Sequence, residues 1–149
     1  MTKIRAALSK SNPLYIDKYA FRTAYYFALQ YPSWKQQYAE TIGSAVKALN
    51  DDGQPHGTDT GDPTARIAMR ASVLRSNIEL IESTALIAGE DLAEYILYAT
   101  TNENITYNYL AGGRCKLGRI PCGKNYYYQR RRLFYYLLSK RLEERNVKS

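Results

Sequence analysis

The chain is poor in the residues that build metal centres and many active sites. Its 149 residues include two cysteines and a single histidine. Cys115 and Cys122 lack the paired short intervals of a zinc site, and His56 lies far from both. His56 sits in a segment rich in glycine and aspartate, which is typical of a solvated loop rather than of a metal site. We therefore expect no metal, no cofactor and two free thiols in a reducing cytoplasm.

The sequence also lacks the signatures of common enzyme classes and of membrane proteins. It has no phosphate-binding P-loop, no G-x-S-x-G elbow and no constellation of His, Cys and acidic residues. No apolar run approaches the roughly 18 residues that cross a bilayer, and no signal-peptide core is recognisable. These absences predict a cytoplasmic protein that is not an enzyme and does not bind a membrane.

The chain is rich in tyrosine, and its charge is distributed unevenly along the sequence. Fifteen tyrosines stand against three phenylalanines, and tyrosine suits half-buried helix faces because its ring packs while its hydroxyl finds a polar partner. Residues 112–149 hold eleven Lys and Arg against two acids, a net charge of +9 (11 − 2). Residues 1–111 carry −2 (10 − 12), and no Lys or Arg occurs from Ser76 to Gly113. This distribution predicts a polyanionic partner for the C-terminal quarter.

Apolar spacing predicts an all-α fold of about six helices. An aromatic helix over 14–30 ends at Pro32, and Ser33 begins a second helix to about Leu49. This second helix steps by four residues along one apolar face: Trp34, Tyr38, Ile42 and Val46. Asn104 is expected to cap a short helix that ends near Ala111. The expected organisation is a basic arm and aromatic helical region over 1–49, a linker over 50–61, and a long helix plus DNA-binding region over 62–149.

The long helix begins at Asp62-Pro63, ends before Gly89 and carries an apolar seam. The seam has heptad spacing and comprises Ile67, Ala71, Leu74, Ile78 and Ile81. A heptad seam needs a partner helix. We expect a homo-oligomer through these side chains, with a dimer favoured. The alternative is packing against the aromatic N-terminal helices of the same chain.

The last helix has two chemically different sides. Leu133, Phe134, Leu137 and Leu138 form an apolar stripe, with Tyr126 two turns earlier. The other side carries cationic, amide and phenolic groups: Lys124, Asn125, Tyr128, Arg131, Arg132 and Tyr135. Such groups suit a DNA groove, since Arg and Lys contact phosphates and guanine, Asn pairs with adenine, and Tyr reaches the backbone. The alternative is a solvated basic face on a terminal helix.

Several segments together resemble a known family. FRTAYYFALQY, GDPTARIA, and ITYNYL followed by IPCGKNYYYQRRRLFYYLL are similar to phage late-gene transcriptional regulators of the RinA/ArpU type. The resemblance spans about Tyr19 to Leu142. It implies a sequence-specific DNA-binding regulator of a phage or prophage in the bacterial cytoplasm, with double-stranded DNA as its partner and host RNA polymerase as a further one.

The resemblance also implies a C-terminal helix-turn-helix similar to region 4 of sigma factors. Residues 105–111 would be the supporting helix, Cys122 the N-cap and residues 123–142 the recognition helix. Asn125 and Arg131 would contact base edges, with Tyr128 beside them. Phosphate contacts would come from the remaining cations: Arg114, Lys116, Arg119, Lys124, Arg130 and Arg132. The connection over 112–121 is longer than the usual turn of about three or four residues, so it either adds a basic loop or changes the docking angle.

Two other functions fit the same charges and the same seam. Phage small terminase subunits are compact helical DNA-binding proteins with a coiled oligomerisation helix, and they assemble rings. A phage-encoded inhibitor of a host nucleic-acid enzyme would instead place the basic helix in that enzyme's channel. Ring assembly would indicate the first, and capture of one host enzyme without affinity for free duplex would indicate the second.

Overall fold

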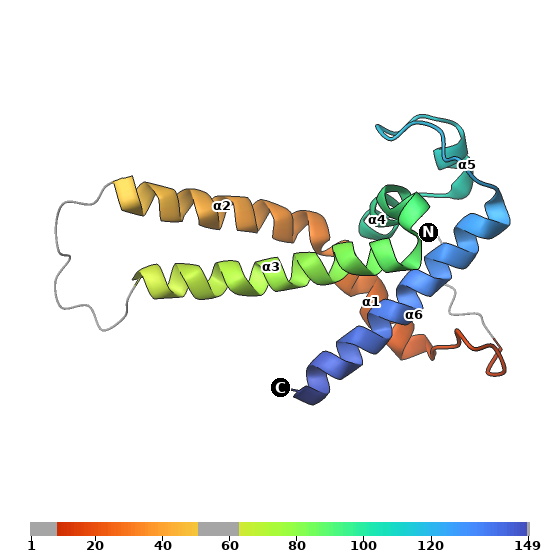
Figure 1. Ribbon diagram of the computed structural model, residues 1–149, viewed down its shortest axis with the longest axis horizontal. Helices are drawn as coiled ribbons and strands as arrows, with labels where there is room; N and C mark the ends of the chain where they lie inside the picture. The colour runs from red at the N-terminus through yellow and green to blue at the C-terminus, as the bar shows by residue number, and fades with distance from the viewer. Residues whose placement is uncertain (1–8, 51–62, 149) are drawn as a thin grey trace. The chain divides into compact units, whose positions relative to one another are not determined.

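The computed structural model describes residues 9–50 and 63–148, and the regular structure in these two ranges is entirely helical (Figure 1). The predicted all-α class is confirmed. The elements are α1 (Lys18–Leu29), α2 (Tyr31–Asn50), α3 (Pro63–Ala88), the 3-10 helix η1 (Glu90–Leu92), α4 (Ala93–Thr101), α5 (Tyr107–Ala111) and α6 (Lys124–Lys148). No helix within these ranges is both long and apolar enough to span a membrane. The start of the predicted arm, the linker from Asp51 with His56, and the Asp62 cap lie outside the described residues.

The helices group into two compact units, which are described separately. The hairpin unit holds α2 and the part of α3 up to Glu79. The α6 unit holds α1, the end of α3 from Leu80, and everything that follows. Chain order therefore does not decide the grouping, because α1 belongs with the C-terminal helices.

The hairpin unit buries a different face of α2 from the one predicted. Ile42 and Val46 are 39% and 51% exposed, whereas Thr41 is buried and Ala45 half-buried. Steps of four residues advance about 400° on a helix, so a run of such steps rotates away from the starting face. Alternating steps of three and four keep the face, and the covered residues of α2 follow them: Tyr31, Trp34, Tyr38, Thr41 and Ala45. The buried hydroxyl of Thr41 is satisfied, since it donates to the Gln37 carbonyl at 2.7 Å.

The seam of α3 is covered to different degrees along its length. Ile67 and Ala71 are half-buried. Leu74, Ile78 and Ile81 are already buried in a single chain, with 6%, 7% and 0% of their surface exposed. The first two residues of the seam are thus the ones that retain exposed surface.

Three helix starts differ from the predicted ones. Helix α1 begins at Lys18 rather than near Leu14, because Asp17 caps it by accepting from the Ala20 amide at 2.8 Å. Helix α2 begins at Tyr31 rather than after a Ser33 cap, which leaves Pro32 in the first turn where its missing N–H does no harm. Helix α5 is capped by Thr106 and not by Asn104. Asn104 instead takes a positive φ of 62°, a conformation that asparagine tolerates.

The core of the α6 unit is built where α1 and α4 pack on α6 and on each other. Its fully buried side chains come from all three helices: Ala24, Ala28, Ile96, Ala99, Tyr127, Phe134 and Leu138. The ring of Phe21 meets the ring of Tyr135 edge-on, with 5.0 Å between centroids. Tyr135 is only 4% exposed, so its predicted outward position is wrong. Helix α1 covers a second side of α6 that the apolar stripe did not indicate.

Candidate nucleic-acid interface

The short helix α5 and the loop after it form one folded element. Thr106 caps α5 by accepting from the Tyr109 amide, and Leu110 at its end is fully buried. The Ile120 amide then donates to the Leu110 carbonyl at 3.1 Å, which closes the loop back onto α5. The connection between α5 and α6 spans residues 112–123 and is a loop, not the tight turn of a standard helix-turn-helix.

Two tyrosine hydroxyls hold this loop in place. The Tyr95 hydroxyl of α4 lies 2.7 Å from the Leu117 carbonyl oxygen and 3.0 Å from that of Arg119. The Tyr107 hydroxyl of α5 donates to the Cys122 carbonyl at 2.7 Å. Gly113 and Gly118 supply the positive φ angles of 70° and 79° that the two bends of the loop require. The loop therefore has a defined shape, although it contains no regular structure.

The loop presents its three cations to solvent and keeps its thiols covered. Arg114, Lys116 and Arg119 are all exposed. Cys115 is buried and Cys122 half-buried, and both are free. Burial raises the pKa of the Cys122 thiol above its usual value, and the nearby Asp91 carboxylate adds to the effect. A thiol of raised pKa stays protonated at neutral pH and is a weak metal ligand and nucleophile.

Helix α6 begins one residue later than expected. The first helical hydrogen bond runs from the Tyr127 amide to the Gly123 carbonyl at 3.1 Å, so Gly123, not Cys122, precedes the helix. Among the predicted DNA-contacting residues, Lys124, Asn125 and Arg132 are exposed. Tyr128 is half-buried, and its hydroxyl oxygen lies 3.4 Å from the Tyr107 amide of α5.

The exposed face of α6 continues beyond the residues that the sequence singled out. Gln129 and Lys140 are exposed and Tyr136 is half-buried, with the Lys140 ammonium 5.6 Å from the centre of the Tyr136 ring. The face follows helical steps of three or four residues: Asn125, Gln129, Arg132, Tyr136 and Lys140. This periodicity is present in the sequence, but the aromatic run around it conceals which tyrosines belong to the surface.

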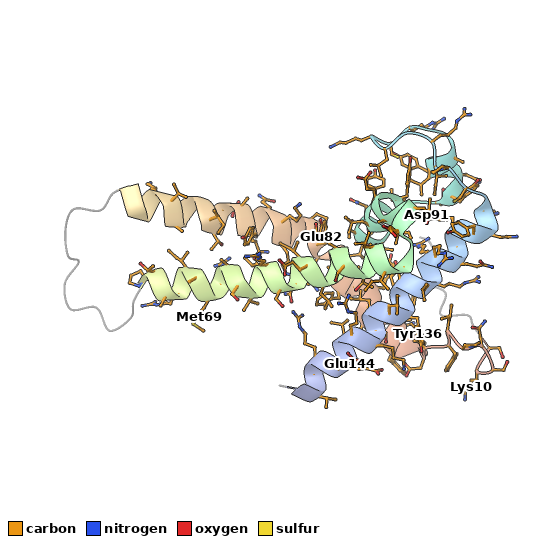
Figure 2. The ribbon with its side chains drawn as sticks, in the orientation of Figure 1. Lys10, Met69, Glu82, Asp91, Tyr136 and Glu144 are labelled. Atoms are coloured by element: carbon orange, nitrogen blue, oxygen red, sulfur yellow. The ribbon has the colours of Figure 1, made fainter. Side chains whose placement is uncertain are left out.

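Arg130 turns inward to the end of α3. Its guanidinium carbon lies 4.9 Å from the centre of the Tyr126 ring, and its Nη1 donates to the Ala88 carbonyl at 3.3 Å. The Tyr126 hydroxyl in turn donates to the carboxylate of Asp91, which Figure 2 labels, at 3.0 Å. A cation at the last carbonyls of a helix is favourable because those carbonyls carry partial negative charge. Arg130 therefore has a structural partner.

Arg131 is also half-buried, on the side of α6 that α1 covers. Its guanidinium carbon lies 5.9 Å from the centre of the Tyr135 ring. Burial raises the pKa of Tyr127 to about 12, while the positive charge of Arg131 acts in the opposite direction. Burial likewise raises the pKa of Tyr135, again opposed by Arg131. The structure thus places Arg131 away from Arg132, its exposed neighbour in the sequence.

The remaining predicted cations are exposed on one unit, in the loop over 112–123 and on α6. Among the described residues, none of these five cations forms an ion pair: Arg114, Lys116, Arg119, Lys124 and Arg132. Unpaired, hydrated cations of this kind are the groups that phosphate oxygens bind.

Comparisons with protein-family models, with curated proteins and with solved structures find no match to this chain.

Proposed function

We propose that the chain is a sequence-specific DNA-binding transcriptional regulator of a phage or prophage, and that it binds duplex DNA through the loop over 112–123 and the exposed face of α6. The observation that carries the proposal is the set of exposed, unpaired cations on these two elements. The same elements also present amide and phenol groups, which can read bases as well as phosphates.

We infer the role of each side chain in the proposed interface from its exposure to solvent. Asn125 is exposed in the first turn of α6 and is the base-reading candidate, with Tyr128 beside it. The exposed cations of the loop and of α6 contact phosphates: Arg114, Lys116, Arg119, Lys124 and Arg132. Arg130 and Arg131 are half-buried and stand apart from this set.

The docking of such an interface differs from that of a standard helix-turn-helix. Helix α5 is five residues long, and it contacts α6 through Tyr107, whose ring lies 5.9 Å from that of Tyr127 and whose amide lies 3.4 Å from the Tyr128 hydroxyl oxygen. The loop replaces the tight turn, which brings three cations beside the N-terminal end of α6. We propose that the loop follows the phosphate backbone while α6 enters the major groove.

Duplex-binding measurements with matched variants test the proposal. The Lys124→Ala/Arg132→Ala protein should bind every duplex more weakly, with the salt slope reduced by about one unit per lost contact. The control is Lys35→Ala/Lys47→Ala, which removes two exposed cations from α2 in the hairpin unit and should leave binding unchanged. Fluorescence anisotropy at several salt concentrations measures both.

Base reading is tested by Asn125→Ala on a duplex selected from random sequences. Loss of a bidentate amide contact should cost about 1–3 kcal/mol on the selected site and little on an unrelated duplex. Equal binding by the wild-type and Lys124/Arg132 variants would refute the interface. A host enzyme captured by a wild-type protein with no duplex affinity would instead support the inhibitor function.

A further inference from the structure

The solvent-exposed side of α1 combines aromatic surface with positive charge. Tyr19 and Tyr26 are 69% and 55% exposed, so each retains more than half of its surface. Lys18 and Arg22 are exposed on the same helix, and α1 contains no acidic residue. Among the described residues, neither cation forms an ion pair. Aromatic rings bury a large area when they are covered by a partner, so this side of α1 is a candidate contact surface.

Helix geometry places the two rings and one cation in a row. Tyr19, Arg22 and Tyr26 are separated by three and four positions, so they lie along one side of α1. The two tyrosines are two turns apart, about 10 Å along the helix axis, and Arg22 lies between them. Tyr25 points elsewhere, since its ring centroid lies 6.2 Å from that of Tyr135 on α6. The exposed row therefore alternates ring, cation and ring.

Each exposed ring has one contact that helps to position it. The Lys18 ammonium lies 5.1 Å from the centre of the Tyr19 ring. The Tyr26 ring meets the Tyr25 ring edge-on, with 5.2 Å between centroids. These contacts leave both tyrosines exposed while restricting their motion. A side chain that is already positioned loses less conformational entropy when a flat group stacks on it.

We propose that this side of α1 binds a single-stranded nucleic acid. The bases of a single strand can stack on Tyr19 and Tyr26, while Lys18 and Arg22 contact the phosphates of the same strand. Stacking on a ring is tolerant of sequence because every base has a flat face. This surface belongs to the same unit as the proposed duplex interface but lies on a different helix. It does not depend on the duplex-binding function proposed above.

The chemistry of the surface favours a strand over two other occupants. A second copy of the same surface would bring like charges together, because α1 carries cations and no acid. A bilayer takes up helices that present Leu, Phe or Trp on their apolar side. The exposed residues of α1 include no such side chain: Lys18, Tyr19, Arg22, Thr23 and Tyr26.

Fluorescence anisotropy with a short labelled oligothymidine tests the site. The Tyr19→Ala/Tyr26→Ala protein should bind the oligomer about tenfold more weakly or worse, since each stacked base contributes roughly fivefold or more to affinity. Tyr19→Phe/Tyr26→Phe keeps both rings and should bind as the wild type does. The control is Leu86→Ala/Ile87→Ala, which removes two exposed apolar side chains from α3 and should leave binding unchanged. Circular dichroism verifies that each variant is folded.

A second ligand separates stacking from charge. An oligomer of the same length that lacks its bases keeps the phosphates but cannot stack. The wild type should bind it more weakly than oligothymidine, and Tyr19→Ala/Tyr26→Ala should bind it as well as the wild type does. Arg22→Met should weaken the binding of both oligomers and reduce the salt slope by about 0.7 unit, the value for one phosphate of a single strand.

Equal affinity of the wild-type and Tyr19→Ala/Tyr26→Ala proteins for oligothymidine would overturn the proposal. A wild type that binds anionic phospholipid vesicles and no strand would also overturn it. Binding of oligothymidine or of oligouridine supports the site, and the stronger of the two identifies the strand as DNA or RNA. Duplex binding should be the same in the wild-type and Tyr19→Ala/Tyr26→Ala proteins. A protein that binds single strands through α1 and binds no duplex would refute the proposed function and retain this site.

Discussion

Arg130, Arg131 and Arg132 are consecutive in the sequence, but the helix places them in three different environments. Each residue is turned by about 100° from the one before it. Arg130 therefore meets the end of α3, Arg131 lies among tyrosines beneath α1, and Arg132 is exposed to solvent. The sequence placed both Arg131 and Tyr135 on the outer side of α6, because its apolar stripe accounted for one packing partner. The second partner, α1, is remote in sequence and left no periodic signal in α6.

Burial of a tyrosine makes the free energy of unfolding decrease at alkaline pH. The pKa of Tyr127 is raised from 10.0 to about 12 by burial. The folded state holds the phenolic proton of Tyr127 more tightly than the unfolded state does. The resulting contribution to the free energy of unfolding is complete below pH 10 and is lost as the pH rises toward 12. The free energy of unfolding should fall by up to about 1.4 kcal/mol per pH unit in this window.

Urea unfolding at pH 9, 10, 11 and 12 measures this dependence. Tyr127→Phe should show a shallower decline, because it removes the titrating hydroxyl. At neutral pH the same variant should be about as stable as the wild type, since the buried hydroxyl that is lost has no close hydrogen-bond partner. A decline of equal slope in both proteins would show that other tyrosines are responsible.

At the scale of elements, the sequence located helices better than it located their faces and ends. The long helix from Pro63 to Ala88 was predicted within a residue, because proline at its start and glycine after its end are both local signals. The face of α2, the start of α1 and the caps of α2 and α5 were wrong. Asp17 and Thr106 compete with other capping residues nearby, and only the packing of each helix decides which one is used.

The loop between α5 and α6 provides a prediction at this scale. Tyr95→Phe removes the hydroxyl that meets the carbonyls of Leu117 and Arg119, so the loop should open more often. Hydrogen exchange of the Gly118 and Ile120 amides should accelerate, while exchange within α4 stays as in the wild type. Tyr15→Phe, which alters a tyrosine before α1, is the control. Unchanged exchange at both amides would show that backbone bonds alone hold the loop.

At the scale of the whole molecule, the sequence indicated a long helix with a seam but not what covers it. Leu74, Ile78 and Ile81 are buried in one chain. No pattern in the sequence indicated that α1 packs in the α6 unit. A contact between helices that are remote in sequence depends on surfaces that exist only after both helices have formed. Pattern analysis was sufficient for the fold class and for the exposed cations of α6, and insufficient for the cluster around Arg131.

The seam can be tested through the concentration dependence of unfolding. Ile78→Ala should lower the free energy of unfolding by about 2–5 kcal/mol, as expected for a truncated core residue. Val73→Ala on the same helix is the control, because Val73 is 61% exposed and should change stability by less than about 0.5 kcal/mol. Because Leu74, Ile78 and Ile81 are already buried in one chain, we expect a wild-type midpoint that is independent of protein concentration. A midpoint that rises with concentration would instead indicate self-association.

The packing of α1 against α6 also has a consequence for synthesis on the ribosome. The hairpin unit is complete once Glu79 has been translated, whereas the Phe21–Tyr135 contact joins residues 114 positions apart (135 − 21). At about 5–20 residues per second, α1 waits roughly 6–23 s for its partner helix. Its aromatic rings at Phe21 and Tyr25 are without α6 during that interval, and a nascent chain in this state is a substrate for chaperones. Slower translation of the segment between Leu80 and Tyr135 should therefore increase chaperone association with nascent chains, which ribosome-bound pull-down would measure.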